Sequence, residues 1–240
     1  SNEYEESISL HQSGQYPYKS IMGGDGMQIA VDTRTNETVY TGFQFGNYYR
    51  INLNSGERKY VTPSHELGDS PYRWNWQTPV ALSTHNQDIL CMGANKLMRS
   101  MNQGNDFVAI SGDLTRGGRK GDVVYGTLTS FSESPLKFGL IYTGSDDGMV
   151  YRTDDGGATW IDLTDGLPGE FWVSRIQASS HDLDRVFVTL NGYRWDNFES
   201  MTYVSNDRGE TWRKIGLDLP LEPVNVILED PMFETILYVG

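Results

Sequence analysis

The stretch YRTDDGGATW, Tyr151–Trp160, recurs as YVSNDRGETW at Tyr203–Trp212. Both copies share the pattern hydroxyl-x-Asp-x-Gly-x-Thr-Trp, which begins at Thr153 in the first copy and at Ser205 in the second. A short Asp side chain accepts hydrogen bonds from nearby backbone N–H groups, and Gly permits a positive φ. Trp adds a large apolar surface and one N–H donor. The pattern therefore predicts a tight turn between two strands.

Every shared position of this turn has a structural role. The residues expected to build the two turns are Thr153, Asp155, Gly157 and Trp160, and Ser205, Asp207, Gly209 and Trp212. Weaker copies begin at Asn52 and Ser100, so the four starts lie about fifty residues apart. A loop repeated around a fold cannot converge on one substrate, and a calcium loop of the EF-hand type needs about six oxygen ligands ending in Glu. We therefore predict neither a catalytic nor a metal site here.

The same period of about fifty residues runs through the apolar segments. Five segments each contain a strand, a polar turn and a second strand, and they end at Gly42, Gly93, Gly144, Leu190 and Gly240. A third strand and the tight turn follow each of the first four. Four short strands per repeat are typical of a β-propeller blade, and no sustained 3.6-residue apolar stripe favours helices. We predict an all-β fold, a β-propeller of four-stranded antiparallel blades with about four to five blades present.

The approximate repeats span 23–75, 76–125, 126–172, 173–222 and a partial 223–240, after an N-terminal segment 1–22. Two arrangements are open. The N-terminal segment could supply the missing strands and close a ring of five blades, or the chain could be part of a larger propeller. We favour the second, because the final ILYVG resembles a chain interrupted within a blade. An open blade edge would then be available for pairing.

Composition excludes several classes of partner. The net charge of −13 over 240 residues opposes nucleic-acid binding. No window holds the 18 or so apolar residues of a membrane span, and this chain shows no signal peptide. Four scattered His and a single Cys offer no metal-ligand spacing, so we expect no metal and no cofactor. Cys91, in the apolar run DILCMG, is expected to be a small buried side chain.

The two turns resemble the Asp-box, or bacterial neuraminidase repeat, which is found in sialidases, xyloglucanases, sortilin-type receptors and photosystem assembly factors. More specifically, residues 73–115 (RWNWQTPVAL…AISGDLT), 172–198 (WVSRIQASSH…YRWDNF) and 223–231 (PVNVILEDP) resemble sortilin-related bacterial proteins labelled glycosyl hydrolases. The resemblance implies an exported or cell-surface protein. It also implies that each Asp-box lies between the third and fourth strands, on the face away from the ligand site.

Propellers bind ligands at one mouth of the central channel, so the loops at that mouth supply the candidate site residues. Aromatic side chains interleaved with charged ones suit a sugar, whose faces stack and whose hydroxyls take bidentate partners. The candidate ligand-binding residues are Arg73, Trp74, Trp76, Trp172, Arg175, Arg194 and Trp195. Alternatively, the Trp side chains plug the propeller, and Arg175 pairs with a carboxylate for structure alone.

A glycosidase needs two carboxylates, about 5 Å apart for retention and about 6.5–9.5 Å apart for inversion. The candidates are Asp147, Glu170 and Asp196. These residues favour a carbohydrate-related propeller, either a glycoside hydrolase or a glycan-binding module, with its ligand at the mouth opposite the Asp-boxes. The alternative is a sortilin-like, non-catalytic scaffold that binds a protein or peptide. Convergence of two carboxylates in an open cleft would distinguish the two hypotheses.

Overall fold

The structure is a computed structural model that describes residues 20–25, 27–118 and 125–240. Regular structure in these residues is almost entirely β, with one short 3-10 helix, η1 (Tyr193–Trp195). No helix in the described part of the chain is long and apolar enough to cross a membrane. The expected N-terminal segment 1–22 lies, apart from its last three residues, outside the described residues.

Four sheets contain four antiparallel strands each, and a fifth contains two. The first sheet comprises β1 (Ala30–Val31), β2 (Thr38–Phe43), β3 (Asn47–Asn52) and β4 (Arg58–Tyr60). The second comprises β5 (Val80–Leu82), β6 (Leu90–Gly93), β7 (Leu97–Ser100) and β8 (Val108–Ala109). The third comprises β9 (Leu128–Glu133), β10 (Ile141–Ser145), β11 (Val150–Thr153) and β12 (Ile161–Asp162). The fourth comprises β13 (Trp172–Ala178), β14 (Val186–Asn191), β15 (Met201–Ser205) and β16 (Arg213–Ile215), and the fifth comprises β17 (Ile227–Glu229) and β18 (Leu237–Val239).

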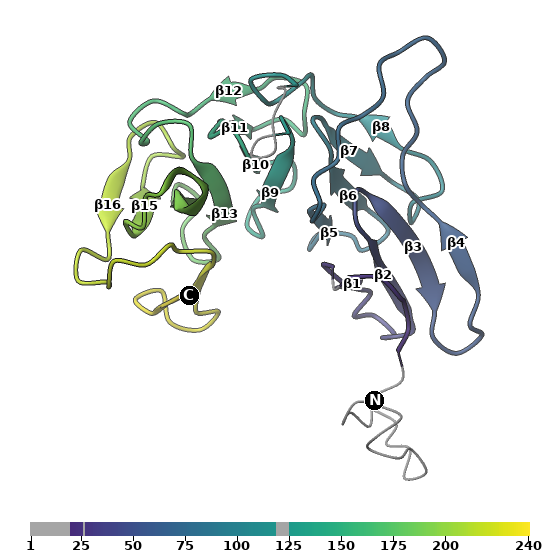
Figure 1. The fold of residues 1–240 in the computed structure, drawn as a ribbon. Helices are drawn as coiled ribbons and strands as arrows, with labels where there is room; N and C mark the ends of the chain where they lie inside the picture. The colour runs from purple at the N-terminus through teal and green to yellow at the C-terminus, as the bar shows by residue number, and fades with distance from the viewer. Residues whose placement is uncertain (1–19, 26, 119–124) are drawn as a thin grey trace, which may run out of the picture.

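The sheets follow one another around an arc in chain order (Figure 1). In each four-stranded sheet the strands pair in sequence order, and the first strand lies on the inner side of the arc while the fourth lies outermost. Successive first strands contact one another, β1 with β5, β9 with β13 and β13 with β17. We call each sheet a blade, numbered one to five along the chain.

The apolar core lies between blades. Every buried cluster combines side chains from two successive sheets. A sheet packs one face against the preceding sheet and the other face against the following sheet. Representative buried pairs are Tyr48 with Met92, Leu97 with Leu128, Val150 with Val188, and Phe187 with Ile227. Cys91, on β6, belongs to the cluster between blades two and three and is buried, as expected.

Two of the repeated glycines are required by the close approach of the next blade. A Cβ on Gly93 would lie 3.1 Å from the Cβ of Leu128, in blade three, and 2.7 Å from Pro79. A Cβ on Gly144 would lie only 2.3 Å from Cγ1 of Val173, in blade four. At Gly93 and Gly144 the glycine therefore permits tight packing against the next blade, whereas at Gly42 it avoids the backbone of Asn47 in its own hairpin.

The turns between third and fourth strands fold around one carboxylate. Asp155 accepts hydrogen bonds from the Thr153 hydroxyl at 2.7 Å and from the backbone N–H and hydroxyl of Thr159, at 3.0 and 2.7 Å. The N–H of Gly157 donates to Thr153 Oγ1 at 2.9 Å, and Gly157 has a φ of 107°. The turn from Ser205 to Trp212 repeats this pattern around Asp207.

The tryptophan of each turn reaches back to the preceding blade. Trp160 Nε1 donates to the carbonyl oxygen of Ile110, and Trp212 Nε1 donates to that of Leu163, both at 2.9 Å. The connection from the second strand leads into the start of the third strand, whereas this turn follows the end of the third strand. The turn and the connection therefore lie at opposite ends of the sheet. The turn thus joins two blades as well as two strands.

A buried glutamate provides a second junction between blades. Glu229, on β17, accepts hydrogen bonds from the Ser179 hydroxyl at 2.9 and 2.8 Å, and His181 Nε2 lies 2.7 Å from the carbonyl oxygen of Asp230. Blades two and three repeat this junction with Ser83 and His85 against Glu133 and the carbonyl oxygen of Ser134. The repeat explains why Ser-x-His occurs in blades two and four.

Candidate functional site

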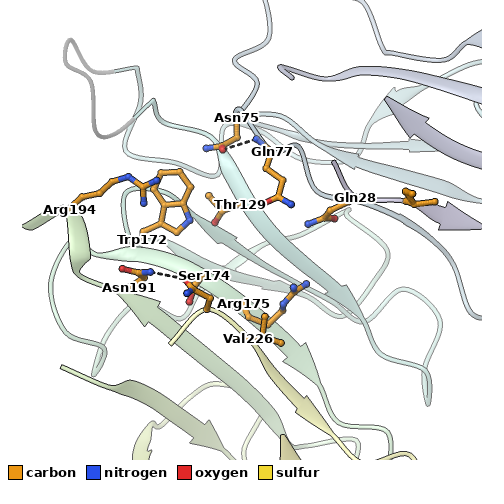
Figure 2. Close-up of a pocket in the computed structure, with 12 residues that line it drawn as sticks. Gln28, Asn75, Gln77, Thr129, Trp172, Ser174, Arg175, Asn191, Arg194 and Val226 are labelled. Atoms are coloured by element: carbon orange, nitrogen blue, oxygen red, sulfur yellow. Dashed lines mark hydrogen bonds between the residues drawn. The ribbon is translucent and has the colours of Figure 1, made fainter. Parts of the chain in front are cut away.

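A polar cavity of about 590 Å³ lies between the inner strands of the blades (Figure 2). Its walls come from the first strands, from the residues just before them, and from the end of β14 and the connection after it. The lining residues are Gln28, Ile29, Asn75, Gln77, Thr129, Trp172, Ser174, Arg175, Asn191, Arg194, Asn225 and Val226. None of these twelve described residues is acidic, whereas two are arginines.

A β-bulge brings two consecutive residues of β13 to the cavity. The register between β13 and β14 shifts between Val173 and Arg175, so Ser174 has no partner in the ladder. Side chains on a regular strand alternate between faces, and a bulge changes that alternation. Ser174 and Arg175 therefore both line the cavity, as Figure 2 shows.

Blade three contains the same bulge, but it has a different residue at the position equivalent to Arg175. There Thr129 is the extra residue, and its hydroxyl donates to the carbonyl oxygen of Val173 at 2.6 Å. Ser174 makes the equivalent bond, to the carbonyl oxygen of Val224 at 2.7 Å. The next residue in blade three is Ser130, which is buried and accepts a hydrogen bond from the N–H of Ile176 at 3.0 Å. Arg175 occupies that position in blade four.

No carboxylate in the described part of the chain pairs with Arg175, and its buried Nε has no hydrogen-bond partner there. Burial lowers the pKa of its guanidinium. A guanidinium that has lost solvent without gaining a counter-ion is energetically costly. The structural alternative, in which Arg175 pairs with a carboxylate of the protein, finds no support among the described residues.

Trp172 and Arg194 form the other wall. The Arg194 guanidinium carbon lies 4.2 Å from the centroid of the Trp172 ring, a cation–π arrangement (Figure 2). Trp172 begins β13 and pairs with Asn191 at the end of β14, and Arg194 follows in η1. An aromatic face backed by a cation is thus fixed at the end of the cavity by paired strand ends.

Amide side chains fill the remaining wall, and some of them retain free hydrogen-bonding groups. Asn191 Nδ2 donates to Asn225 Oδ1 at 2.7 Å, and Val80 N donates to Gln28 Oε1 at 3.3 Å. Within the described residues, Gln28 Nε2, Asn225 Nδ2 and the Gln77 side-chain amide have no hydrogen-bond partner. Amides of this kind can donate to or accept from sugar hydroxyls.

Asn75 is held from behind by a buried network. Its Nδ2 donates to Thr127 Oγ1 at 2.8 Å, and that hydroxyl donates to Asp146 Oδ2 at 2.9 Å. Asp146 also accepts the N–H groups of Thr127 and Tyr125. Burial raises the pKa of Asp146 despite these bonds. The network orients Asn75 and leaves Asp146 no access to the cavity.

The seven predicted ligand-binding residues divide into two groups. Trp172, Arg175 and Arg194 line the cavity. Among the other four, Arg73 pairs with Asp113 at 2.6 Å and donates to the Gly126 carbonyl, so it joins loops. The three remaining tryptophans pack elsewhere: Trp74 against the cluster between blades one and two, Trp76 edge-on to Phe45 at the surface, and Trp195 edge-on to Phe171.

The three predicted catalytic carboxylates are not among the cavity-lining residues. Asp147 is fully buried and accepts hydrogen bonds from the Ser145 hydroxyl at 2.6 Å and from the N–H of Arg116 at 2.8 Å. Glu170 is half exposed, 3.8 Å from Arg116 Nε. Asp196 is exposed and ends η1 in the left-handed conformation, with a φ of 54°. Their catalytic roles stay predictions.

Several cavity residues could not be selected from the sequence. Gln28, Asn75, Gln77 and Asn225 are ordinary polar residues without a motif around them. These four residues have one feature in common, because each lies shortly before the first strand of a repeat. In a propeller the first strands lie around the central axis. Asn191 ends the second strand of its repeat, and it likewise has no motif around it.

Xyloglucanases are among the curated proteins that match part of the sequence. A xyloglucanase of Paenibacillus sp is 31% identical over 136 residues, which are 51% of this chain and 13% of that protein. A xyloglucanase of Acetivibrio thermocellus is 33% identical over 114 residues, which are 42% of this chain and 14% of that protein. The matched part of the chain therefore spans about one-seventh of the length of these relatives. No protein-family model matches the sequence.

Solved structures match almost the whole chain. The GH74 xyloglucanase from Xanthomonas campestris aligns with a TM-score of 0.62 at 18% identity, covering 86% of this chain and 32% of that one. The Dos1 propeller aligns with a TM-score of 0.63 at 16% identity, covering 88% of this chain and 53% of that one. The chain folds as β-propeller blades. At these identities the likeness establishes the fold alone, and it confirms the architecture expected from the repeat.

Proposed function

We propose that this propeller binds a carbohydrate chain in the cavity between its inner strands. The observation that carries the proposal is the cavity lining, an aromatic face at Trp172 beside amides and hydroxyls, without a described acidic residue. Sugar rings stack on aromatic faces, and their hydroxyls need convergent polar partners. The similarity to two xyloglucanases supports a carbohydrate ligand.

The proposal favours binding over hydrolysis for this part of the molecule. A glycosidase places two carboxyl groups on either side of the scissile bond. Asp147 uses both of its carboxylate oxygens to hold the Ser145 and Arg116 loops, and its side chain is fully buried. Replacing it would disturb the loop before it affected any bound sugar. We assign Asp147 a structural role in this proposal.

The proposal extends to the turns and to the ligand mouth. We take the two turns that begin at Thr153 and Ser205 to be Asp-boxes. Each turn then identifies the end of a blade at which the third strand meets the fourth. The ligand then enters from the opposite end of the sheets, where β14 ends at Asn191 and η1 begins. Blade four supplies both the aromatic wall and Arg175, so it is the principal blade of the site.

A cell-wall glycan array tests this function. The probes are xyloglucan and pectic oligosaccharides, applied to the wild-type chain, to Trp172→Ala and to Phe233→Ala, a control in the exposed turn between β17 and β18. We expect the wild type and the control to retain a common set of glycans. Trp172→Ala should weaken the strongest interaction at least tenfold, about 1.4 kcal/mol. A wild-type chain that retains no glycan would refute the proposal.

A further inference from the structure

The cavity has a charge opposite to that of the protein. The chain carries 32 acidic and 19 basic residues, a net charge of −13, yet the two charged residues among the described cavity lining are Arg175 and Arg194. Arg194 is engaged with the Trp172 ring, whereas Arg175 has no anionic partner among the described residues. A positive pocket in an acidic molecule selects for an anionic group at that point.

The position of Arg175 is not explained by the needs of the fold. The equivalent residue in blade three, Ser130, accepts the N–H of Ile176 and so helps to join its blade to the next. Arg175 makes no such bond, although the neighbouring hydroxyls of Thr129 and Ser174 preserve theirs in both blades. The bulge at Ser174 then turns the guanidinium to the cavity.

We propose, on the basis of the carbohydrate function above, that the ligand is an acidic saccharide and that Arg175 pairs with its carboxylate. A guanidinium binds a carboxylate through two parallel N–H···O bonds, which suits a uronic acid residue. The free amide groups of Gln28, Gln77 and Asn225 are available for the ring hydroxyls. Trp172 supplies the stacking face for a neighbouring sugar in the chain.

A matched pair of probes isolates the carboxylate. Oligogalacturonide carries one carboxylate per sugar, and its fully methyl-esterified form has the same backbone without the charge. We expect the wild type to bind the acid at least tenfold more tightly than the ester in calorimetric titrations. We also expect the affinity for the acid to fall with added salt, since salt screens the ion pair.

Three variants assign that preference to Arg175. Arg175→Gln should bind acid and ester equally, at the wild-type affinity for the ester. Arg175→Lys should keep a reduced preference, because an ammonium retains the charge but not the bidentate geometry. Arg213→Gln, an exposed change on β16, should behave as the wild type. The melting temperature of Arg175→Gln should not fall, since the change removes an unpaired half-buried charge.

Five results would overturn the inference, and they separate it from the proposed function. Equal wild-type affinity for acid and ester removes the acidic ligand but leaves carbohydrate binding in place. A preference that survives in Arg175→Gln removes the pairing of the carboxylate with Arg175, again without affecting carbohydrate binding. A large drop in the melting temperature of Arg175→Gln shows a structural role instead. Failure to bind either form, or any glycan on the array, removes both proposals. Arg175-dependent binding of a peptide through its free C-terminal carboxylate, without glycan binding, also removes both and assigns the cavity to peptides.

Discussion

Trp212 Nε1 donates a hydrogen bond to the carbonyl oxygen of Leu163, 49 residues earlier in the chain and 2.9 Å away. The donor belongs to a turn in blade four, and the acceptor follows β12 in blade three. A local eight-residue pattern thus holds a long-range contact, which is repeated by Trp160 and Ile110. The turn therefore contributes to the stability of the interface between blades.

Trp212→Phe should lower the free energy of unfolding by about 1–2 kcal/mol, because it removes this hydrogen bond and part of the packed surface. Urea unfolding followed by circular dichroism measures the change. The control is Trp76→Phe, which is 46% exposed and should alter stability by less than about 0.5 kcal/mol. Equal effects of the two substitutions would contradict a specific role for the interblade bond.

Gly144→Ala should destabilise the protein by about 1–3 kcal/mol, because its Cβ would lie 2.3 Å from Cγ1 of Val173. Gly112→Ala is the matched control, since a Cβ there has no heavy atom within 4 Å. Its effect should stay within about 0.5 kcal/mol. Thermal or urea unfolding of both variants checks the prediction. A Gly144→Ala protein as stable as the wild type would mean that blade four can move away without cost.

Acid should weaken the turns through Asp155 and Asp207. Hydrogen bonds from Ser205 and Thr211 lower the pKa of Asp207 to about 2, and those from Thr159 and Thr153 lower the pKa of Asp155. A carboxyl whose folded pKa is depressed contributes stability that is complete above its unfolded pKa of about 4. That contribution is lost as the pH falls through the folded pKa, so for Asp207 the window runs from about pH 4 to about pH 2.

Asp207→Asn tests this dependence. The stability difference between wild type and variant should be constant from neutral pH down to about pH 5 and should shrink below about pH 4, because the variant has no carboxyl to protonate. Urea midpoints at a series of pH values measure it. Asp218→Asn, an exposed loop residue without a hydrogen bond in the described chain, is the control. A difference that does not change with pH would exclude the Asp207 carboxylate as its source.

Cys91 should be unreactive in the folded protein. Burial raises the pKa of its thiol to about 12, and its side chain lies in the cluster between blades two and three. Since the thiolate is the nucleophile, labelling by a disulfide reagent at pH 8 should be on the order of a thousandfold slower than for an exposed thiol. Urea should restore fast labelling. Rapid reaction without urea would show that the two blades separate readily.

The repeat could be predicted from the sequence because local interactions determine it. The turns around Asp155 and Asp207 bond within eight residues of one chain segment, so their residue types must recur wherever the turn recurs. Gly93 and Gly144 lie where a Cβ would press against a side chain of the next blade. A fixed period in such residues indicates repeated supersecondary units, and the four-stranded sheets agree with it.

The candidate site could be predicted only in part from the sequence, because its lining depends on the register of strand pairing. Aromatic and charged residues in the loops drew attention to Arg73, Trp74 and Trp195, which the structure places in ion pairs and packing contacts away from the cavity. The unremarkable Gln28 and Asn225 line it instead. Residue type alone does not predict which of these side chains line the cavity. Their position at the axis depends on the residue at which each first strand begins.

The amino-acid sequence by itself determined the blades of this protein, their period and the turns that join strands three and four, because those features arise from hydrogen bonds and packing between near neighbours in each repeat. Only the tertiary structure decided which side chains meet at the axis. The one-residue bulge at Ser174 turns Arg175 to the cavity, and five blades must converge before Trp172, Gln28 and Asn225 share one space. The register shift that brings Arg175 to the cavity leaves no mark in the sequence pattern, and it contributes one of the two positive charges of the site.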